Sequence, residues 1–176
     1  RNYYFCNVTT NISSKSICPK YIIMPLSSVD FANILRNMAY KRHLVNLNKT
    51  QVNKLLFMCY GLYLAFYGEK LFSETPKAWP YGPVFPNVYK LYSLFRVPIF
   101  ITEEKSKDFE NNERAKNIFT QVIDKYCHVS AYNLSMWSHL PGGPWHKTVY
   151  GINGDENSGW NKEISDELIK NYFTKK

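Results

Sequence analysis

A helical pattern of apolar and polar positions opens at Ser27. Four apolar residues follow the 0, 3, 4, 7 spacing that places side chains on one face of a helix: Phe31, Ile34, Leu35 and Met38. Ser27 or Ser28 can cap the N-terminus, and the positive residues at 41–43 suit the negative end of the helix dipole. We therefore predict a helix over residues 27–43 with one buried face.

The next run, from Val52 to Phe66, is apolar almost all round. Asn48 and Gln51 ahead of it form a capping-box sequence, and Gly68 beyond it is typical of a helix end. The run is interrupted at Asn53, Lys54 and Gly61. A helix that is apolar on every side has to be covered on every side, which predicts a central helix around which the other elements pack.

Short strands are predicted between residues 71 and 102. Leu71-Phe72 and Ala78-Trp79 flank a turn at residues 73–76, a pattern that predicts a two-stranded hairpin. The segment 98–102 is typical of a further strand, which could join the hairpin. Between them, Pro86 fits the first turn of a helix that continues to about Phe95.

Three further helices are predicted in the last seventy residues. Acidic residues at 108, 110 and 113 open a long amphipathic helix that runs through Tyr126. Ser130 can cap a short helix that ends at the Pro-Gly-Gly-Pro turn of residues 141–144, and Ser165 can cap a last helix through Tyr172. The predicted fold is mainly α: a compact bundle of about six helices around a central apolar helix, with a small antiparallel β-sheet.

The first residues differ from the rest of the chain. Residues 1–23 mix Asn, Thr, Ser and Lys with scattered aromatics, and Met24-Pro25 follows them. We predict that residues 1–23 form an N-terminal extension or arm and that residues 24–176 form a single domain.

Composition and charge indicate a packed protein with a basic first half. Apolar residues make up 45% of the chain and aromatics 16%, so some aromatic side chains are expected at a surface that meets a partner. Residues 1–100 carry 12 positive and 3 negative charges, whereas residues 101–176 carry 10 and 11. Such asymmetry suits an acidic partner, either nucleic acid or protein, although solubility alone explains it equally well.

The cysteines indicate a reducing compartment. They show no C-x-x-C pair, and Cys59 and Cys127 lie in apolar helical stretches, as reduced core thiols do. We therefore expect a cytoplasmic protein. No apolar run reaches the ~20 residues of a membrane span, so no membrane association is expected.

Signatures of catalysis are absent from the sequence. It contains no Gly-rich phosphate loop, no G-x-S-x-G and no H-E-x-x-H. Cys127 and His128 are neighbours whose side chains point about 100° apart on a helix, and His139 with His146 lacks a third metal ligand. We predict a protein that is not an enzyme, with no catalytic residues, no cofactor and no metal site.

A basic cluster surrounds the junction of the first two predicted helices. It comprises Lys41, Arg42, His43, Lys49 and Lys54. Two helices joined by a short loop have the outline of a helix-turn-helix. The second helix is too apolar to lie in a DNA groove, so phosphate contact is plausible and base reading is not.

The segment of residues 78–86 carries two large aromatics, Trp79 and Tyr81, on a backbone with three prolines within seven residues. Trp79 and Tyr81 on such a stiff backbone have little entropy to lose on binding, which favours a docking surface. Alternatively, both side chains fill the core beside the central helix. Pro144-Trp145, with His139 nearby, presents the same two alternatives.

Several motifs follow one another in the order of a known family. They are Lys54-Leu55-Leu56-Phe57, Gly61, Tyr67-Gly68, Leu71-Phe72, Ala78-Trp79, Tyr81-Gly82-Pro83-Val84, Pro86, Tyr89, His139, Pro144-Trp145, Ile164 and Tyr172-Phe173. Over roughly residues 47 to 173 the chain resembles the Panacea domain, the SocA-like antitoxin domain found in phage-associated proteins. The resemblance implies a mainly helical domain that neutralises a toxin encoded beside it, by direct binding or by delivering the toxin to a protease.

The leading hypothesis is therefore an antitoxin-type protein-binding module, with a cognate toxin and protease machinery as expected partners. The alternative is a DNA-binding transcriptional regulator that uses the basic first half. The candidate partner-binding residues are Trp79, Tyr81, Pro83, Phe85, His139, Trp145, Lys41, Arg42 and Lys54.

Overall fold

The computed structural model describes residues 25–93, 100–151 and 160–174, and this part of the chain contains eight helices and two short strands. In chain order they are α1 (Ser28–His43), α2 (Lys49–Tyr67), β1 (Lys77–Trp79), β2 (Gly82–Val84), α3 (Pro86–Ser93), α4 (Glu103–Glu110), α5 (Glu113–Tyr126), α6 (Ala131–Ser138), α7 (Pro144–Tyr150) and α8 (Asp166–Thr174). The mainly α fold with a small antiparallel sheet is confirmed. The predicted arm, residues 1–23, lies outside the described residues.

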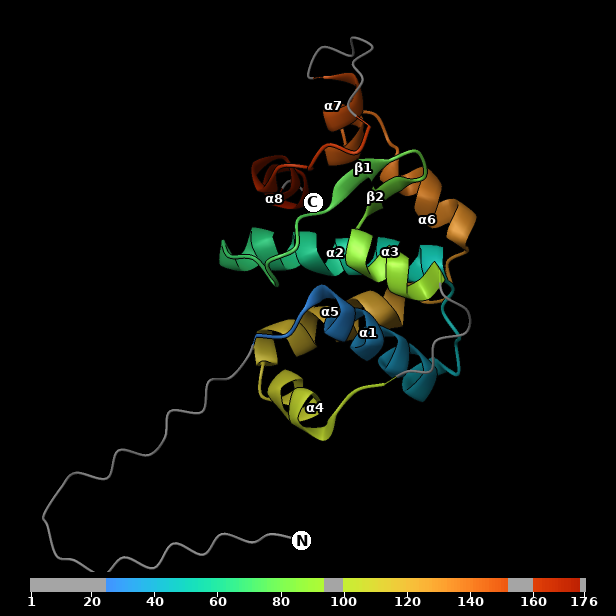
Figure 1. Ribbon diagram of the computed structural model, residues 1–176, viewed down its shortest axis with the longest axis vertical. Coiled ribbons are helices and arrows are strands. Elements are labelled where there is room, and N and C mark those ends of the chain that lie inside the picture. Colours follow the sequence, from blue (N-terminus) through green and yellow to red (C-terminus); the bar gives the residue numbers. More distant parts are fainter. Residues whose placement is uncertain (1–24, 94–99, 152–159, 175–176) are drawn as a thin grey trace, which may run out of the picture.

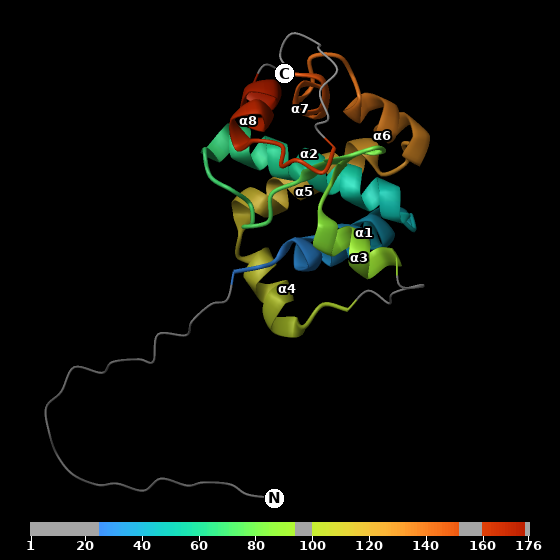
Figure 2. The same ribbon diagram turned by 45° about the horizontal axis from the view of Figure 1, so that its top comes forward.

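Helix α2 runs through the middle of the molecule, with α6, α8 and the hairpin on one side and α1 and α5 on the other (Figures 1 and 2). The capping box is present: the Asn48 side chain accepts from the Gln51 N–H at 3.0 Å, and the Gln51 side chain accepts from the Asn48 N–H at 3.1 Å. Gly68 ends the helix in the left-handed conformation with φ 73°. The predicted central helix is therefore confirmed.

An aromatic cluster joins α1 to its neighbours in the core. The Phe31 ring of α1 lies 5.5 Å from Phe119 of α5, 6.2 Å from Phe109 of α4 and 5.7 Å from Phe72, which precedes β1. All four rings are buried. The cluster therefore joins α1, α4 and α5, the helices drawn below α2 in Figure 1, to the segment that precedes β1.

The long helix predicted from residue 108 onwards is wrong in its start, because two helices occupy this stretch. Thr102 caps α4 by accepting from the Lys105 N–H, and Asn112 caps α5 by accepting from the Ala115 N–H. The acidic residues at 108 and 110 belong to α4, and a break at residues 111–112 separates the two helices. The strand predicted at 98–102 is not present over 100–102, where the chain leads into the Thr102 cap, and residues 98–99 lie outside the described part.

A two-stranded hairpin exists, but the predicted pairing is wrong. β1 pairs with β2 around a turn at Pro80-Tyr81, rather than with Leu71-Phe72. The stretch before β1 is bound to α1 and α3 instead. The Glu74 carboxylate accepts hydrogen bonds from the Asn87 N–H at the start of α3 and from the Ser28 hydroxyl of α1. On its other edge β1 is flanked by residues 161–164, with the Ala78 N–H donating to the Lys162 carbonyl at 2.8 Å.

Helix α7 was not predicted, because Pro144 is the start of a helix as well as part of the turn that ends α6. A proline fits the first turn, where its missing N–H has no partner to lose. Helix α8 is capped by Ser165 as predicted, with its hydroxyl accepting from the Leu168 N–H. Every helix in the described part of the chain is too short or too polar to cross a bilayer.

Candidate functional site

Side chains from three helices, α2, α6 and α7, hold the hairpin by donating hydrogen bonds to its carbonyl oxygens. The four contacts are Trp145 Nε1 to Trp79 O at 2.8 Å, His139 Nε2 to Pro80 O at 3.1 Å, Ser135 Oγ to Tyr81 O at 3.3 Å and Lys54 Nζ to Pro83 O at 3.0 Å. Because these carbonyls span nearly the whole turn, the backbone of residues 79–83 is fixed against α2, α6 and α7. We call residues Trp79–Gly82 the hairpin tip.

Tyr81 projects from this fixed backbone into solvent. Its side chain is 79% exposed, the largest exposure among the big hydrophobic residues of the described chain. The turn preceding it is stiffened by Pro80 and the strand following it by Pro83. An aromatic ring is thus presented on a backbone that has little freedom left to lose.

Trp79 is half-buried at the base of the tip. Its indole N–H donates to the Asn161 side chain at 3.0 Å, and its ring packs edge-on against Tyr89 of α3 at 4.9 Å. His139 supports the same region from α6, since its ring lies 4.0 Å from that of Trp145. Its Nδ1 faces the Ser135 carbonyl at 2.6 Å, so both ring nitrogens face carbonyl acceptors.

Two polar residues of α2 point at β2. The Asn53 side chain accepts from the Phe85 N–H at 3.1 Å, and Lys54 binds the Pro83 carbonyl. Lys54 is only 1% exposed, and burial lowers the pKa of its ammonium from 10.5 to about 7. Both residues therefore anchor the hairpin from beneath.

A small cavity of about 280 Å³ opens beside the hairpin tip. Its walls include Tyr81, Lys54 and Lys49, and the Lys49 Nζ lies 3.9 Å above the ring of Tyr89. The cavity thus combines aromatic faces with the Lys49 cation close to Tyr81.

Most of the residues proposed from the sequence come together here. Trp79, Tyr81, Pro83, His139, Trp145 and Lys54 all belong to the hairpin or its anchors. However, Lys54, Pro83, Phe85 and Trp145 are buried, so their side chains are not accessible at the surface of this structure. Lys54 and Trp145 bind hairpin carbonyls at Pro83 and Trp79, and the Phe85 ring packs on Tyr60 and Phe72 in the core.

Lys41 and Arg42 lie apart from the hairpin, at the end of α1. Arg42 binds Asp124 of α5 through two hydrogen bonds of 2.9 and 2.7 Å, and His43 Nε2 lies 2.7 Å from the same carboxylate. The hydrogen bonds from Arg42 and His43 lower the pKa of Asp124 to about 2. The sequence did not identify Asp124 as the ion-pair partner of Arg42, because Asp124 lies on a different helix.

The sequence also did not predict an apolar groove on the surface. This groove, of about 680 Å³, lies between α2, α5, α6 and α8, and its lining includes Met58, Leu62, Phe66, Trp137 and Phe173. Phe66 in this lining is 69% exposed.

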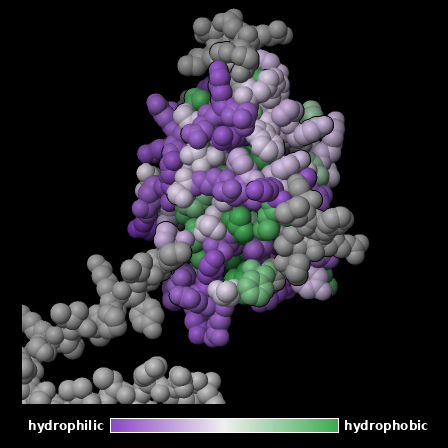
Figure 3. All heavy atoms as spheres, viewed as in Figure 1, coloured by the Kyte–Doolittle hydropathy of each residue, from purple (hydrophilic) through white to green (hydrophobic). Residues whose placement is uncertain are grey.

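Figure 3 shows the hydropathy of the face drawn in Figure 1. This face is mainly hydrophilic, with hydrophobic side chains visible in a band between α1 and the α2–α3 pair.

The sequence that forms the hairpin lies within a stretch that matches a known protein family. A family model described as "Antitoxin SocA-like, Panacea domain" matches residues 52–146, a little over half of the chain. The chain belongs to the SocA-like antitoxin family. Antitoxin SocA of Caulobacter vibrioides (strain NA1000 / CB15N) is 28% identical over 139 residues, which cover 73% of this chain and 73% of that protein. No solved structure matches the chain.

The match to the Panacea domain begins in α2 and ends in α7. It therefore includes the hairpin together with the residues that anchor it: Lys54, Ser135, His139 and Trp145. Lys41 and Arg42 lie outside the matched span. The anchored hairpin is thus part of the Panacea domain itself, whereas the basic end of α1 precedes the matched residues.

Proposed function

We propose that this protein is an antitoxin that neutralises a toxin protein by binding it directly through the hairpin tip. Membership of the SocA-like family and the likeness to a protein named Antitoxin SocA support the antitoxin role. The observation that carries the choice of surface is the exposure of Tyr81 on a backbone held by Lys54, Ser135, His139 and Trp145.

A rigid exposed tyrosine is well suited to dominate a protein interface. Tyrosine is among the residue types that supply most of the binding energy at such interfaces. A backbone fixed before binding loses little entropy when the complex forms, so more of the contact energy remains as affinity. Tyr132 extends the surface, because it is 71% exposed and lies one turn before Ser135 on the α6 face that binds the hairpin.

Co-expression with the product of a neighbouring gene tests this proposal. We expect the wild-type chain to restore growth and to co-purify with the toxin, and Tyr81→Ala to lose both. Phe100→Ala is the matched control, since Phe100 is 75% exposed and lies outside the hairpin. Unimpeded toxicity with the wild-type chain would remove the antitoxin role, whereas full protection by Tyr81→Ala would remove the hairpin tip from the interface.

The same cells distinguish masking from delivery to a protease. Direct masking leaves the half-life of the toxin unchanged while growth is restored. A protease adaptor shortens that half-life, and its protection disappears when the protease is inactivated. Toxin half-life measured by pulse-chase, with and without this protein, separates the two mechanisms.

A DNA-binding regulator is the alternative function, and it has less support. Arg42, one of the cations it would use, is engaged by Asp124, and α2 is buried along most of its length. A helix covered in this way has no face free to enter a groove. Salt-dependent binding to its own promoter, lost in Lys41→Ala with Lys49→Ala, would favour the regulator over the antitoxin.

A further inference from the structure

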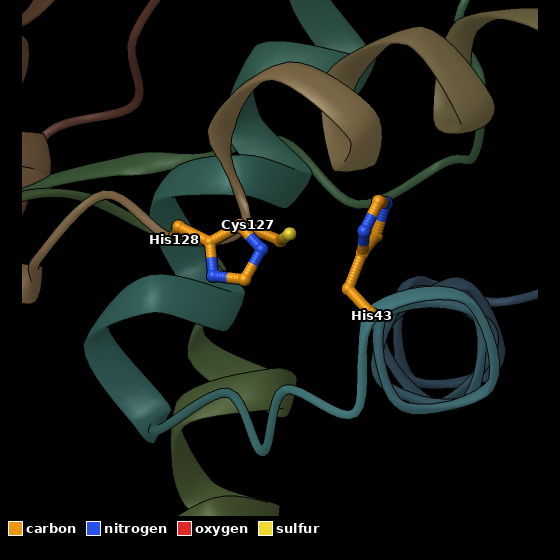
Figure 4. A group of neighbouring side chains, drawn as sticks. All are labelled: His43, Cys127 and His128. Atoms are coloured by element: carbon orange, nitrogen blue, oxygen red, sulfur yellow. The ribbon is translucent and has the colours of Figure 1, made fainter.

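The C-terminal ends of α1 and α5 bring three metal-ligating side chains together (Figure 4). His43 is the last residue of α1, and Cys127 and His128 directly follow α5. One ligand atom from each residue, two ring nitrogens and the Cys127 sulfur, all lie within 4.8 Å of one another. Cys127 is buried, His43 is half-buried and His128 is exposed, so the cluster opens towards solvent on one side.

We propose that His43, Cys127 and His128 form a binding site for a divalent metal ion of the zinc class. Thiolate and imidazole are the ligands that Zn²⁺ prefers, at bond lengths that place tetrahedral ligands about 3.3–3.6 Å apart. The ligand atoms lie within 4.8 Å of one another without a metal, so any distance between two of them would shorten by at most about 1.5 Å on binding. Three protein ligands leave a fourth position for water or for a group supplied by a partner.

Asp124 supports this assignment from outside the cluster. Its carboxylate lies 2.7 Å from His43 Nε2, which leaves Nδ1 as the nitrogen that can bind a metal. Histidine ligands commonly donate their second N–H to a carboxylate, which fixes the ring and strengthens the ligand. Arg42 holds Asp124 in turn through two hydrogen bonds, so the orientation of His43 is set without any metal.

The two helix ends favour a cation at this position. The C-terminus of a helix carries partial negative charge from its unpaired carbonyls, and both α1 and α5 end here. Binding needs the Cys127 thiol to exchange its proton for the metal, so that Cys–SH and M²⁺ give Cys–S–M⁺ and H⁺. The site would join α1 to α5, the two helices that lie on the same side of α2 in Figure 1.

Titration of the purified full-length chain with Co²⁺ tests the proposal. Co²⁺ takes the same ligands as Zn²⁺, and a thiolate bound to it gives a charge-transfer absorption that reports the sulfur directly. We expect one equivalent of Co²⁺ to produce this band and one equivalent of Zn²⁺ to abolish it. Cys127→Ser should remove the band, and His43→Ala and His128→Ala should each weaken Co²⁺ binding at least tenfold.

Variants of the other cysteines control for binding of Co²⁺ to a thiol other than that of Cys127. Cys59→Ser removes the other buried thiol of the described residues, and a Cys6→Ser/Cys18→Ser double variant removes the remaining cysteines. We expect all of these to retain the band. Asp124→Asn should weaken binding about 10–100-fold without changing the shape of the absorption band, because Asp124 acts only through His43.

The exposed His128 keeps the test decisive even if Cys127→Ser folds poorly, because His128→Ala removes no buried group. Circular dichroism of each variant establishes that it is folded. No charge-transfer band in the wild-type chain, a band that persists in Cys127→Ser, or unchanged affinity in His128→Ala would each overturn the proposal. The outcome is independent of toxin neutralisation, because the readout is spectroscopic.

Discussion

A β-carbon added to Gly82 would lie 2.7 Å from the Nζ atom of Lys54. The same β-carbon would collide with the Ser138 hydroxyl, and Gly82 has a φ of 98°, which side chains rarely adopt. The hairpin therefore approaches α2 as closely as a residue without a side chain allows. This approach brings the Pro83 carbonyl within reach of Lys54.

Gly82→Ala should lower the free energy of unfolding by more than the backbone strain alone. We expect a loss of at least about 1–3 kcal/mol from the positive φ, with the collision in addition. Gly142→Ala is the control, since Gly142 has a φ of 78° but nothing within 4 Å of an added β-carbon. Urea unfolding measures both variants, and equal losses would contradict the close packing of Lys54 under Gly82.

Lys54 should make stability depend on pH in the alkaline range. Its pKa is about 7 in the folded protein and 10.5 when exposed, so between these values the unfolded chain binds the extra proton. Stability therefore rises with pH from about 7 to about 10, with a slope of up to about 1.4 kcal/mol per pH unit from this group. Below pH 7 both states are protonated and the contribution stays constant.

The comparison with Lys54→Met isolates this effect, because methionine fills similar space without a charge. The difference in unfolding free energy between the wild type and Lys54→Met should change steadily from pH 7 to pH 9. A difference that is constant over this range would show that the ammonium is not desolvated in the folded state.

Gly61→Ala should destabilise the protein although alanine is the better helix former. Alanine gains about 1 kcal/mol of helix propensity over glycine. The added β-carbon would overlap the Phe173 ring of α8, and overpacking of this kind costs about 1–3 kcal/mol. In a Phe173→Ala background the collision is absent, so Gly61→Ala should become neutral or stabilising. A double-mutant cycle measured by urea unfolding gives the coupling, and additivity of the two changes would argue against the contact.

Substitutions of Trp145 and Tyr81 should differ in their effect on the free energy of unfolding. Trp145→Phe removes the N–H that binds the Trp79 carbonyl and should cost about 1–3 kcal/mol of unfolding free energy. Tyr81→Ala should change stability by less than about 0.5 kcal/mol, because the side chain is exposed. Thermal and urea unfolding of the two variants provide the comparison. A large loss in Tyr81→Ala would mean that its ring is packed rather than presented.

The central helix illustrates how far the sequence alone reaches. Its all-round apolar character predicted burial, and that prediction is confirmed. Its three interruptions had no explanation from periodicity, yet each corresponds to a contact with a distant segment. Asn53 and Lys54 bind the backbone of the hairpin, and Gly61 makes room for Phe173. The interruptions of the apolar pattern thus marked residues that contact distant segments, although those segments could not be identified without the fold.

Errors in the predicted elements have a similar origin. The hairpin was assigned to the wrong partner because the turn-forming residues 73–76 and 80–81 are equally strong local signals. In the structure the turn at 80–81 forms the hairpin, and Glu74 of the other turn is instead bound by Ser28 and Asn87. Likewise, the grouping of His43 with Cys127 and His128 could not be found from the sequence, because these residues are far apart along the chain and only the packing of α1 against α5 brings them together.

The position of α8 over α2 has a consequence for how the chain is made. Tyr60 of α2 donates to Asp166 of α8 across a separation of 106 residues. During translation that side of α2 therefore stays uncovered until the residues of α8 have left the ribosome. A message that terminates before Asp166 would yield a chain whose central helix is exposed along one side, and such a product is expected to be removed by cellular proteases rather than to accumulate.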